Sequence, residues 1–84
     1  AAEVGYLAME LDDLGRYDAS ERLLAKYAAA TQDSTLAAVA PLFKRWRAVA
    51  RARSAWARAA QSDGARRDAY LSRSRRLFEL ALSY

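Results

Sequence analysis

The residues of this chain that are best suited to bind a ligand are basic and lie close together in residues 41–61. That stretch contains six basic side chains, no acidic side chain and both tryptophans of the chain. Arginine suits phosphate and carboxylate groups, because its planar guanidinium donates two parallel hydrogen bonds. At helical spacing, four of these residues predict one basic stripe: Lys44, Arg47, Arg51 and Arg58. Three kinds of negatively charged group are candidates to pair with the stripe: carboxylates of the chain itself, an anionic small ligand, and nucleic acid. Plain solvation of the stripe is the alternative to pairing within the chain.

The remaining residues of this stretch argue against nucleic acid. Trp46 and Trp56 fall in an apolar arc opposite the stripe, so we expect both rings to lie in the core and not to stack on bases. The arc consists of Leu42, Trp46, Val49, Ala50, Trp56, Ala57 and Ala60. Arginine supplies 12 of the 14 basic residues, a bias that is also typical of a GC-rich genome. An anionic ligand therefore stays open as a partner, whereas nucleic acid is not expected.

Arg53 does not fit the separation of a basic stripe from an apolar arc, because its position falls in the middle of the apolar arc. A guanidinium among apolar neighbours is costly unless a carboxylate or solvent reaches it. We expect Arg53 either to pair with Glu10 or Glu79, or to line a pocket that opens on that face.

The acidic residues Glu10, Asp12 and Asp13 form the one acidic cluster of the chain. Adjacent residues on a helix point about 100° apart, so Asp12 and Asp13 cannot chelate one metal ion by themselves. We expect a solvated helix end. The chain has no histidine and no cysteine, which excludes thiol nucleophiles, disulfides, histidine bases and the usual zinc ligands. The sequence predicts no catalytic residue, no metal site and no cofactor held by this chain.

Eighty-four residues predict a single helical domain, residues 1–84, with a thin margin of stability. No apolar run approaches the roughly 20 residues of a membrane span, and no signal peptide is visible, so we expect a cytoplasmic protein without membrane contact. Residues 1–33 carry a net charge of −4 and residues 34–84 carry +8. Packing of the acidic part on the basic part explains this asymmetry, and an external anionic partner is the alternative.

Hydrophobic periodicity predicts four helices. The first covers residues 3–14, on a stripe of Val4, Leu7, Leu11 and Leu14, and ends at Gly15. The second follows Asp18. A short turn over residues 36–40 then precedes a long helix, 41–61, which starts at Pro41 because proline is tolerated at the first helical position. The fourth, residues 66–83, buries an apolar face and leaves Arg73, Arg75 and Arg76 in solvent.

These elements predict an all-α fold, a four-helix antiparallel bundle-like domain with one long central helix. Leu80 and Tyr84 would remain uncovered in such a unit, and both chain ends lie within apolar periodic segments. We therefore expect a fragment of a larger fold, and the remainder of a parent protein is the expected partner.

Two families have similar patterns. The first helical hairpin resembles a tetratricopeptide repeat in the spacing of Leu7, Leu14, Gly15, Tyr17 and Leu24. The likeness covers about 34 residues, and the rest of the chain does not repeat that period. Under this resemblance the chain would be a protein-interaction module. A small basic nucleic-acid binder is a third alternative.

The second likeness extends over nearly the whole chain. Four helical segments follow one another at similar spacing within three stretches: EVGYLAMELDDLGRYDASERLLAKYAAATQD, PLFKRWRAVARAR and SRRLFELALSY. Together they resemble the carboxy-terminal helical part of aminoglycoside-phosphotransferase-like kinases, in the bacterial group that carries a P-loop ATPase domain. Relative to that pattern, Glu3 replaces an aspartate, Gly5 an alanine, Trp46 a tyrosine and Arg53 a lysine.

This resemblance implies a kinase-like parent fold whose nucleotide-binding lobe, HGD-type catalytic loop and magnesium-binding aspartate lie outside the chain. ATP and magnesium are then implied for the parent alone. The chain itself would be a non-catalytic scaffold and substrate-side wall. The resemblance makes Arg47, Arg51 and Arg53 the candidate contacts for substrate or phosphate.

Overall fold

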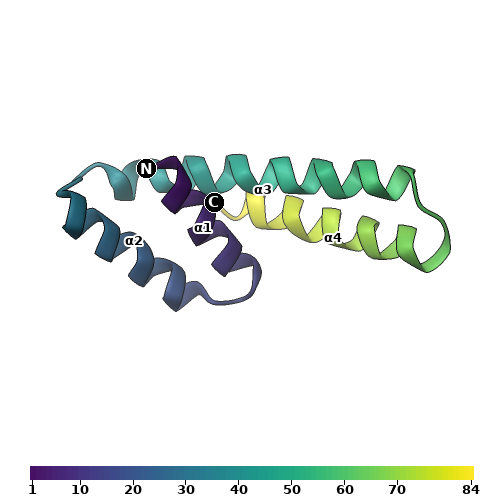
Figure 1. Ribbon diagram of the computed structural model, residues 1–84, viewed down its shortest axis with the longest axis horizontal. Helices are drawn as coiled ribbons and strands as arrows, with labels where there is room; N and C mark the ends of the chain where they lie inside the picture. Colours follow the sequence, from purple (N-terminus) through teal and green to yellow (C-terminus); the bar gives the residue numbers. More distant parts are fainter.

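The computed structural model describes all 84 residues, which form four α-helices and no strand (Figure 1). The helices are α1 (Ala2–Asp13), α2 (Tyr17–Thr31), α3 (Leu36–Ala60) and α4 (Gly64–Leu82). The all-α class, the number of helices and the long third helix agree with the prediction. Gly15 has a φ of 75° where the chain leaves α1, which is the conformation expected of a glycine at a helix end.

The longest contact in the molecule is the antiparallel hairpin of α3 and α4, which extends across Figure 1. The α3 side of its seam is built from small residues. On α3 these are Ala48, Ala52, Ala55 and Ala59, and on α4 the buried residues are Ser74, Leu77, Leu80 and Ala81. Alanines at spacings of three and four residues let two helices approach closely. The buried hydroxyl of Ser74 donates a hydrogen bond of 2.8 Å to the carbonyl of Ala52, so the seam also contains a polar link.

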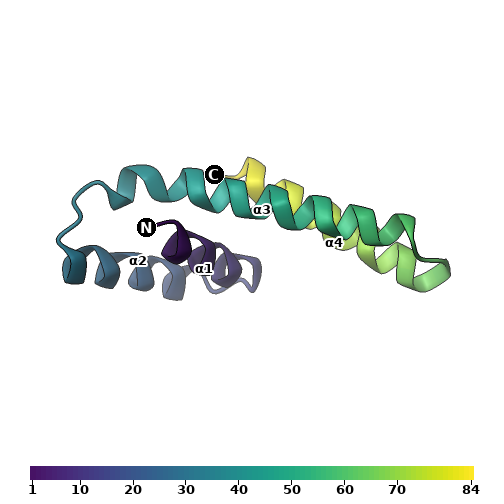
Figure 2. The same ribbon diagram turned by 45° about the horizontal axis from the view of Figure 1, so that its top comes forward.

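The shorter pair, α1 and α2, lies beside the amino-terminal half of α3, as both ribbon views show (Figures 1 and 2). Met9 of α1 is completely buried and joins Ala48, Ala52 and Leu77 in the main core. A second, smaller core contains Val4, Leu36 and Ala40, with Leu23, Leu24 and Tyr27 of α2 packed around it. Through these two clusters, α1 connects the pair to the long hairpin.

The molecule is elongated, with extents of 48 × 18 × 18 Å and a radius of gyration of 14.4 Å. A compact domain of this length would have a radius of gyration of roughly 12 Å. The difference arises because the distal part of the hairpin, toward the connection between α3 and α4, extends beyond the α1–α2 pair (Figure 1). No helix has an apolar stretch long enough to cross a bilayer.

The predicted start of the long helix at Pro41 is wrong. Helix α3 begins at Leu36 and continues through Pro41 without interruption. Proline removes one backbone hydrogen bond inside a helix and disfavours the α conformation of the residue before it. The burial of Leu36 and Ala40 against Val4 outweighs this cost, because it fixes the first turns of α3 in helical geometry.

The predicted core face of α3 is also wrong. The side chains of Trp46, Trp56 and Leu42 are 71%, 62% and 62% exposed, whereas the alanine seam of α3 is buried. A periodicity analysis favours the stripe of largest apolar side chains, but α4 packs against the stripe of smallest ones. As a result the two tryptophans lie on the surface.

Similar reversals occur on the other helices. Leu7 and Leu14 of α1 are exposed, and its buried residues are Val4, Gly5, Ala8, Met9 and Asp12. On α4, Leu82 is exposed, while Leu80 is buried and Tyr84 packs against the main core. The expectation that Leu80 and Tyr84 remain uncovered is therefore wrong.

Candidate functional site

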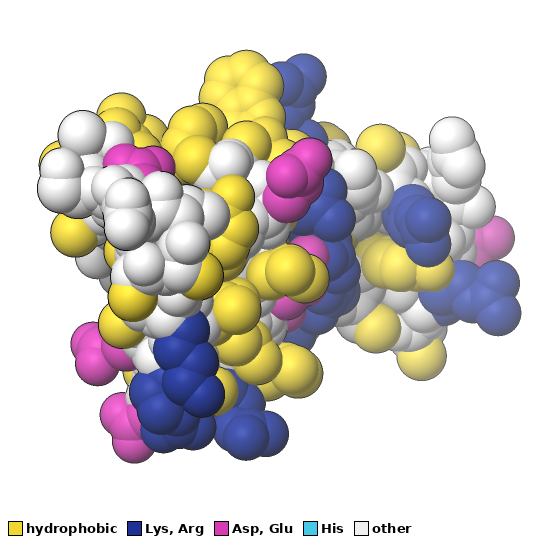
Figure 3. Space-filling model, turned by 60° about the vertical axis from the view of Figure 1, so that its left-hand side comes forward, with side chains coloured by type: hydrophobic (Ala, Val, Ile, Leu, Met, Phe, Trp, Pro, Cys, Tyr) yellow, Lys and Arg dark blue, Asp and Glu magenta, His cyan; other side chains and the backbone are white.

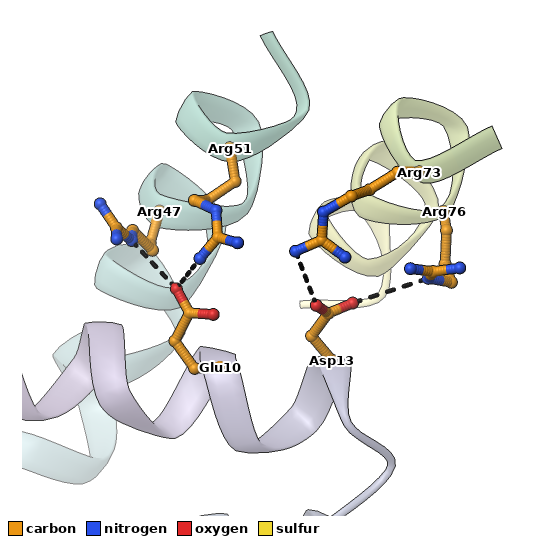
Figure 4. A network of polar contacts seen from close by, with 6 residues as sticks. All are labelled: Glu10, Asp13, Arg47, Arg51, Arg73 and Arg76. Carbon is orange, nitrogen blue, oxygen red and sulfur yellow. Dashed lines mark hydrogen bonds and ion pairs between the residues drawn. The ribbon is translucent and has the colours of Figure 1, made fainter. Parts of the chain in front are cut away.

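The polar edge of α1 receives the basic side chains of both long helices (Figure 4). Glu10 lies between two arginines of α3. Arg47 Nε is 3.4 Å from Glu10 Oε1, and Arg51 donates a closer hydrogen bond to the same oxygen. The guanidinium of Arg47 also lies 5.6 Å from the centroid of the Tyr6 ring, within the range of a cation–π contact. One carboxylate thus holds two guanidinium groups.

Asp13 makes an equivalent arrangement with α4. Its carboxylate is 3.4 Å from Arg73 and 3.7 Å from Arg76. The side chain of Asp13 is only 7% exposed, and that of Asp12 only 3%. The predicted solvated helix end is therefore wrong. Arg73 is only 33% exposed, contrary to its predicted solvation, whereas Arg76 is 59% exposed and lies on the solvent side as predicted. Local spacing does not reveal the partners of this acidic cluster, because all of them follow it by more than 30 residues in the sequence.

Asp12 forms the most deeply buried ion pair. Lys44 Nζ lies 2.9 Å from Asp12 Oδ2, and the Tyr84 hydroxyl donates a 2.6 Å hydrogen bond to the same oxygen. The ammonium of Lys44 is also 5.2 Å from the centroid of the Tyr84 ring. Burial, together with the hydrogen bond to the Asp12 carboxylate, raises the pKa of Tyr84 far above its ordinary value of 10.0. The phenol is thus held in its protonated form.

The three arginines suggested as ligand contacts do not share one face. Arg47 and Arg51 are half-buried beside Glu10, whereas Arg53 is exposed and lines a shallow groove of about 390 Å³ on the outer side of α3. The other residues of that groove are Leu42, Arg45, Trp46, Val49 and Ala50. Arg53 was expected either to pair with Glu10 or Glu79 or to line a pocket. Neither carboxylate reaches Arg53, and its side chain lines the groove.

A second basic surface lies between the distal parts of α3 and α4, and the sequence analysis did not identify it. A depression of about 360 Å³ is lined by Arg51, Ser54, Ala55, Arg58, Tyr70 and Arg73. Arg51 and Arg58 are two helical turns apart, and Tyr70 and Arg73 share one face of α4. The heptad spacing of Arg51 and Arg58 was visible in the sequence, but the packing of α4 beside them was not.

The molecule also has a larger apolar groove of about 650 Å³ between α2 and α3. Leu24, Ala28, Leu36 and Ala40 line it, and Glu21 and Lys44 supply charge at its sides. Hydrophobic side chains reach the surface in several places at this end of the molecule, and one large hydrophobic side chain projects at the upper edge of the space-filling view (Figure 3).

These sites offer binding groups and no group placed for bond-making or bond-breaking chemistry. Histidine and cysteine are missing from the sequence, and no three carboxylates gather in a way that could hold a metal ion. The carboxylates of Glu10, Asp12 and Asp13 are all engaged by cations of the chain. No protein-family model, curated protein or solved structure matches the chain.

Proposed function

We propose that this chain is a non-catalytic helical subdomain of a phosphotransferase-like protein of the aminoglycoside-kinase type, in which it acts as a scaffold and as a wall on the substrate side. The proposal rests first on the four segments that resemble the helical part of such kinases. ATP and magnesium would belong to the parent protein, because this chain has no glycine-rich loop and no HGD-type loop.

The observation that carries the proposal is the outer face of α3. Trp46, Trp56 and Leu42 are each more than 60% exposed on a helix whose opposite side is packed. Large exposed apolar side chains that gather on one face are typical of a surface that contacts another part of a protein. Arg53 and Arg45 lie in the same groove and give this face positive charge. We infer that the catalytic lobe of the parent covers the face with apolar and acidic residues.

The ion pairs of α1 support a scaffold role. Glu10, Asp12 and Asp13 link α1 to both long helices through five basic side chains. Such a network fixes the angle between the α1–α2 pair and the hairpin, because each carboxylate is nearly enclosed or shared between two partners. A wall that shapes a substrate site needs that kind of fixed geometry.

The coding sequence upstream of residue 1 tests the proposal. We expect it to encode a nucleotide-binding lobe and an HGD-type loop, and the isolated chain to transfer no phosphate from ATP. When the chain is produced together with that upstream segment, acrylamide should quench Trp46 and Trp56 less than in the isolated chain. Single-tryptophan variants, Trp46→Phe and Trp56→Phe, assign the change to each ring. Upstream repeats of 34 residues without such a loop would refute the proposal.

A second candidate function, a tetratricopeptide-like interaction module, is favoured by the apolar groove between α2 and α3. Small side chains such as Ala28 and Ala40 line this groove, and a partner helix packs most closely on small residues. The α1–α2 hairpin also has the antiparallel form that one such repeat requires. The same upstream sequence decides between the two candidates.

A further inference from the structure

We propose that the depression between the distal parts of α3 and α4 binds a compact dianion, such as the phosphoryl or pyrophosphoryl group of a small ligand. The residues that would hold it are Arg51, Ser54, Arg58, Tyr70 and Arg73. This inference goes beyond the scaffold role and does not depend on it, because it uses only residues of this chain.

Residues with hydrogen-bond donors converge on this depression from two helices. Arg51, Ser54 and Arg58 lie at positions i, i+3 and i+7 of α3 and so share one face. Tyr70 and Arg73 lie at positions i and i+3 of α4 and line the same depression. The lining residues are thus three arginines, a serine, a tyrosine and an alanine, and no acidic residue is among them.

Positive charge is in excess around this depression. Arg47 and Arg51 share the single carboxylate of Glu10, and Arg73 and Arg76 share that of Asp13 (Figure 4). Each carboxylate neutralises one guanidinium, so each group retains one positive charge. Arg58 has no carboxylate partner and adds another. A bound dianion would compensate charges that the chain itself leaves uncompensated.

Ion pairs fix the positions of two of the three guanidinium groups. Arg51 and Arg73 are about one-third exposed, and Glu10 and Asp13 hold them from the side of α1. Figure 4 shows both side chains directed toward neighbouring positions on α1. Because these arginines are already ordered, a ligand loses less affinity to side-chain ordering than it would on a free surface.

The chemical class of the ligand follows from the lining. Arginine donates paired hydrogen bonds to phosphate oxygens, and hydroxyl groups add single ones. The volume of about 360 Å³ and the few apolar atoms suit an anionic head group better than a large apolar ligand. A phosphate group of a small molecule and the backbone phosphate of nucleic acid share this chemistry, so the experiment must separate them.

Isothermal titration with sodium pyrophosphate, at ionic strength held constant with sodium chloride, tests the site. We expect saturable binding of one pyrophosphate per chain, weakened about tenfold or more in Arg58→Gln, since a hydrogen bond to a charged group accounts for at least that factor. Arg58→Lys keeps the positive charge but loses the paired N–H donors of the guanidinium group, so the affinity of this variant for pyrophosphate should be intermediate. The matched control is Arg75→Gln, which removes the same charge from an exposed residue outside the depression and should bind as the parent chain does.

Arg58 is exposed and has no ion pair, so these variants should fold normally, which circular dichroism checks. Absence of saturable binding, or equal losses in Arg58→Gln and Arg75→Gln, would overturn the proposal. Titration with a single-stranded oligonucleotide tests whether the surface binds nucleic acid instead. Strongly salt-dependent binding of the oligonucleotide that Arg58→Gln weakens, in the absence of saturable pyrophosphate binding, would assign the surface to nucleic acid and would also overturn the proposal. Neither outcome bears on the scaffold role, which the upstream sequence tests.

Discussion

Gly5 of α1 lies directly against Phe43 of α3, where the two helices meet. A Cβ atom added at Gly5 would be 2.6 Å from the Cβ atom of Phe43, which is attached to the backbone and cannot turn away. We predict that Gly5→Ala destabilises the domain by about 1–3 kcal/mol, the usual cost of overpacking. Helix propensity alone would give the opposite sign, because alanine is favoured over glycine by about 1 kcal/mol in a helix. Urea unfolding followed by circular dichroism tests this, because the sign of the change in the free energy of unfolding distinguishes overpacking from helix propensity.

The control for this prediction is Phe43→Gly, alone and combined with Gly5→Ala. Because the clash involves the Cβ atom of Phe43, its removal should cancel most of the penalty of Gly5→Ala in the double variant. Additive effects of the two substitutions would show that the helices do not meet at this point.

The exposure of the tryptophans leads to a second prediction. Trp46→Ala and Trp56→Ala should each change the free energy of unfolding by less than about 1 kcal/mol, far below the 3–5 kcal/mol typical of a buried tryptophan. Leu77→Ala is the matched core variant, and we expect it to cost about 2–5 kcal/mol, since Leu77 is fully buried between α3 and α4. A large loss of stability in either tryptophan variant would contradict the arrangement of α3.

A third prediction concerns Asp12. Asp12→Ala leaves the ammonium of Lys44 and the hydroxyl of Tyr84 without their acceptor in a largely buried setting. Breaking a buried pair from one side costs about 3–5 kcal/mol, and we expect a loss at the lower end because Lys44 keeps some contact with water. Asp68→Ala is the control: Asp68 is exposed and unpaired, so its removal should stay within about 0.5 kcal/mol. Thermal or urea unfolding of the two variants should separate them clearly.

A fourth prediction follows from the raised pKa of Tyr84. Below pH 10 the phenol is protonated in both the folded and the unfolded chain, so its contribution to stability is complete. Above pH 10, the ordinary pKa, the unfolded chain loses this proton while the folded chain keeps it, and the free energy of unfolding should fall as pH rises. Tyr84→Phe should be less stable at pH 8 and should lack this component of the decline. Tyr70→Phe, which changes a tyrosine on the distal part of α4 that does not act on Tyr84, should decline as the parent chain does.

The sequence predicted the helices well because each has a recognisable end. Gly15 ends α1, and polar residues separate α2 from α3 and α3 from α4. The packing of α3 was not predictable in the same way. Its periodicity contains a stripe of large apolar residues and a stripe of alanines, and only the small residues of α4, such as Ser74 and Ala81, determine which stripe is buried. A single sequence does not show which helix faces are neighbours.

Several residues of the candidate site could be predicted from the sequence, but not how the helices bring them together. The opposite charges of the two parts of the chain indicated that acidic and basic residues pair within the molecule, and the ion pairs of Glu10, Asp12 and Asp13 match that interpretation. Arg51 belonged to the predicted basic stripe, and the family resemblance made it a ligand candidate. Its relation to Arg73 depends on how closely α3 and α4 approach, which residue spacing on one helix does not contain.

The extension of the α3–α4 hairpin beyond the α1–α2 pair has a kinetic consequence. The buried residues of the distal half of the hairpin are small (Ala55, Ala59 and Ser74), so this end buries little surface per turn and should open far more often than the region around Met9. Amide hydrogen exchange should therefore be fastest near Ala60 and Gly64 and become slower toward Ala48. An anion held jointly by Arg51, Arg58 and Arg73 would connect the two helices across this weak end, so a ligand that binds there would slow its opening without altering the rest of the molecule.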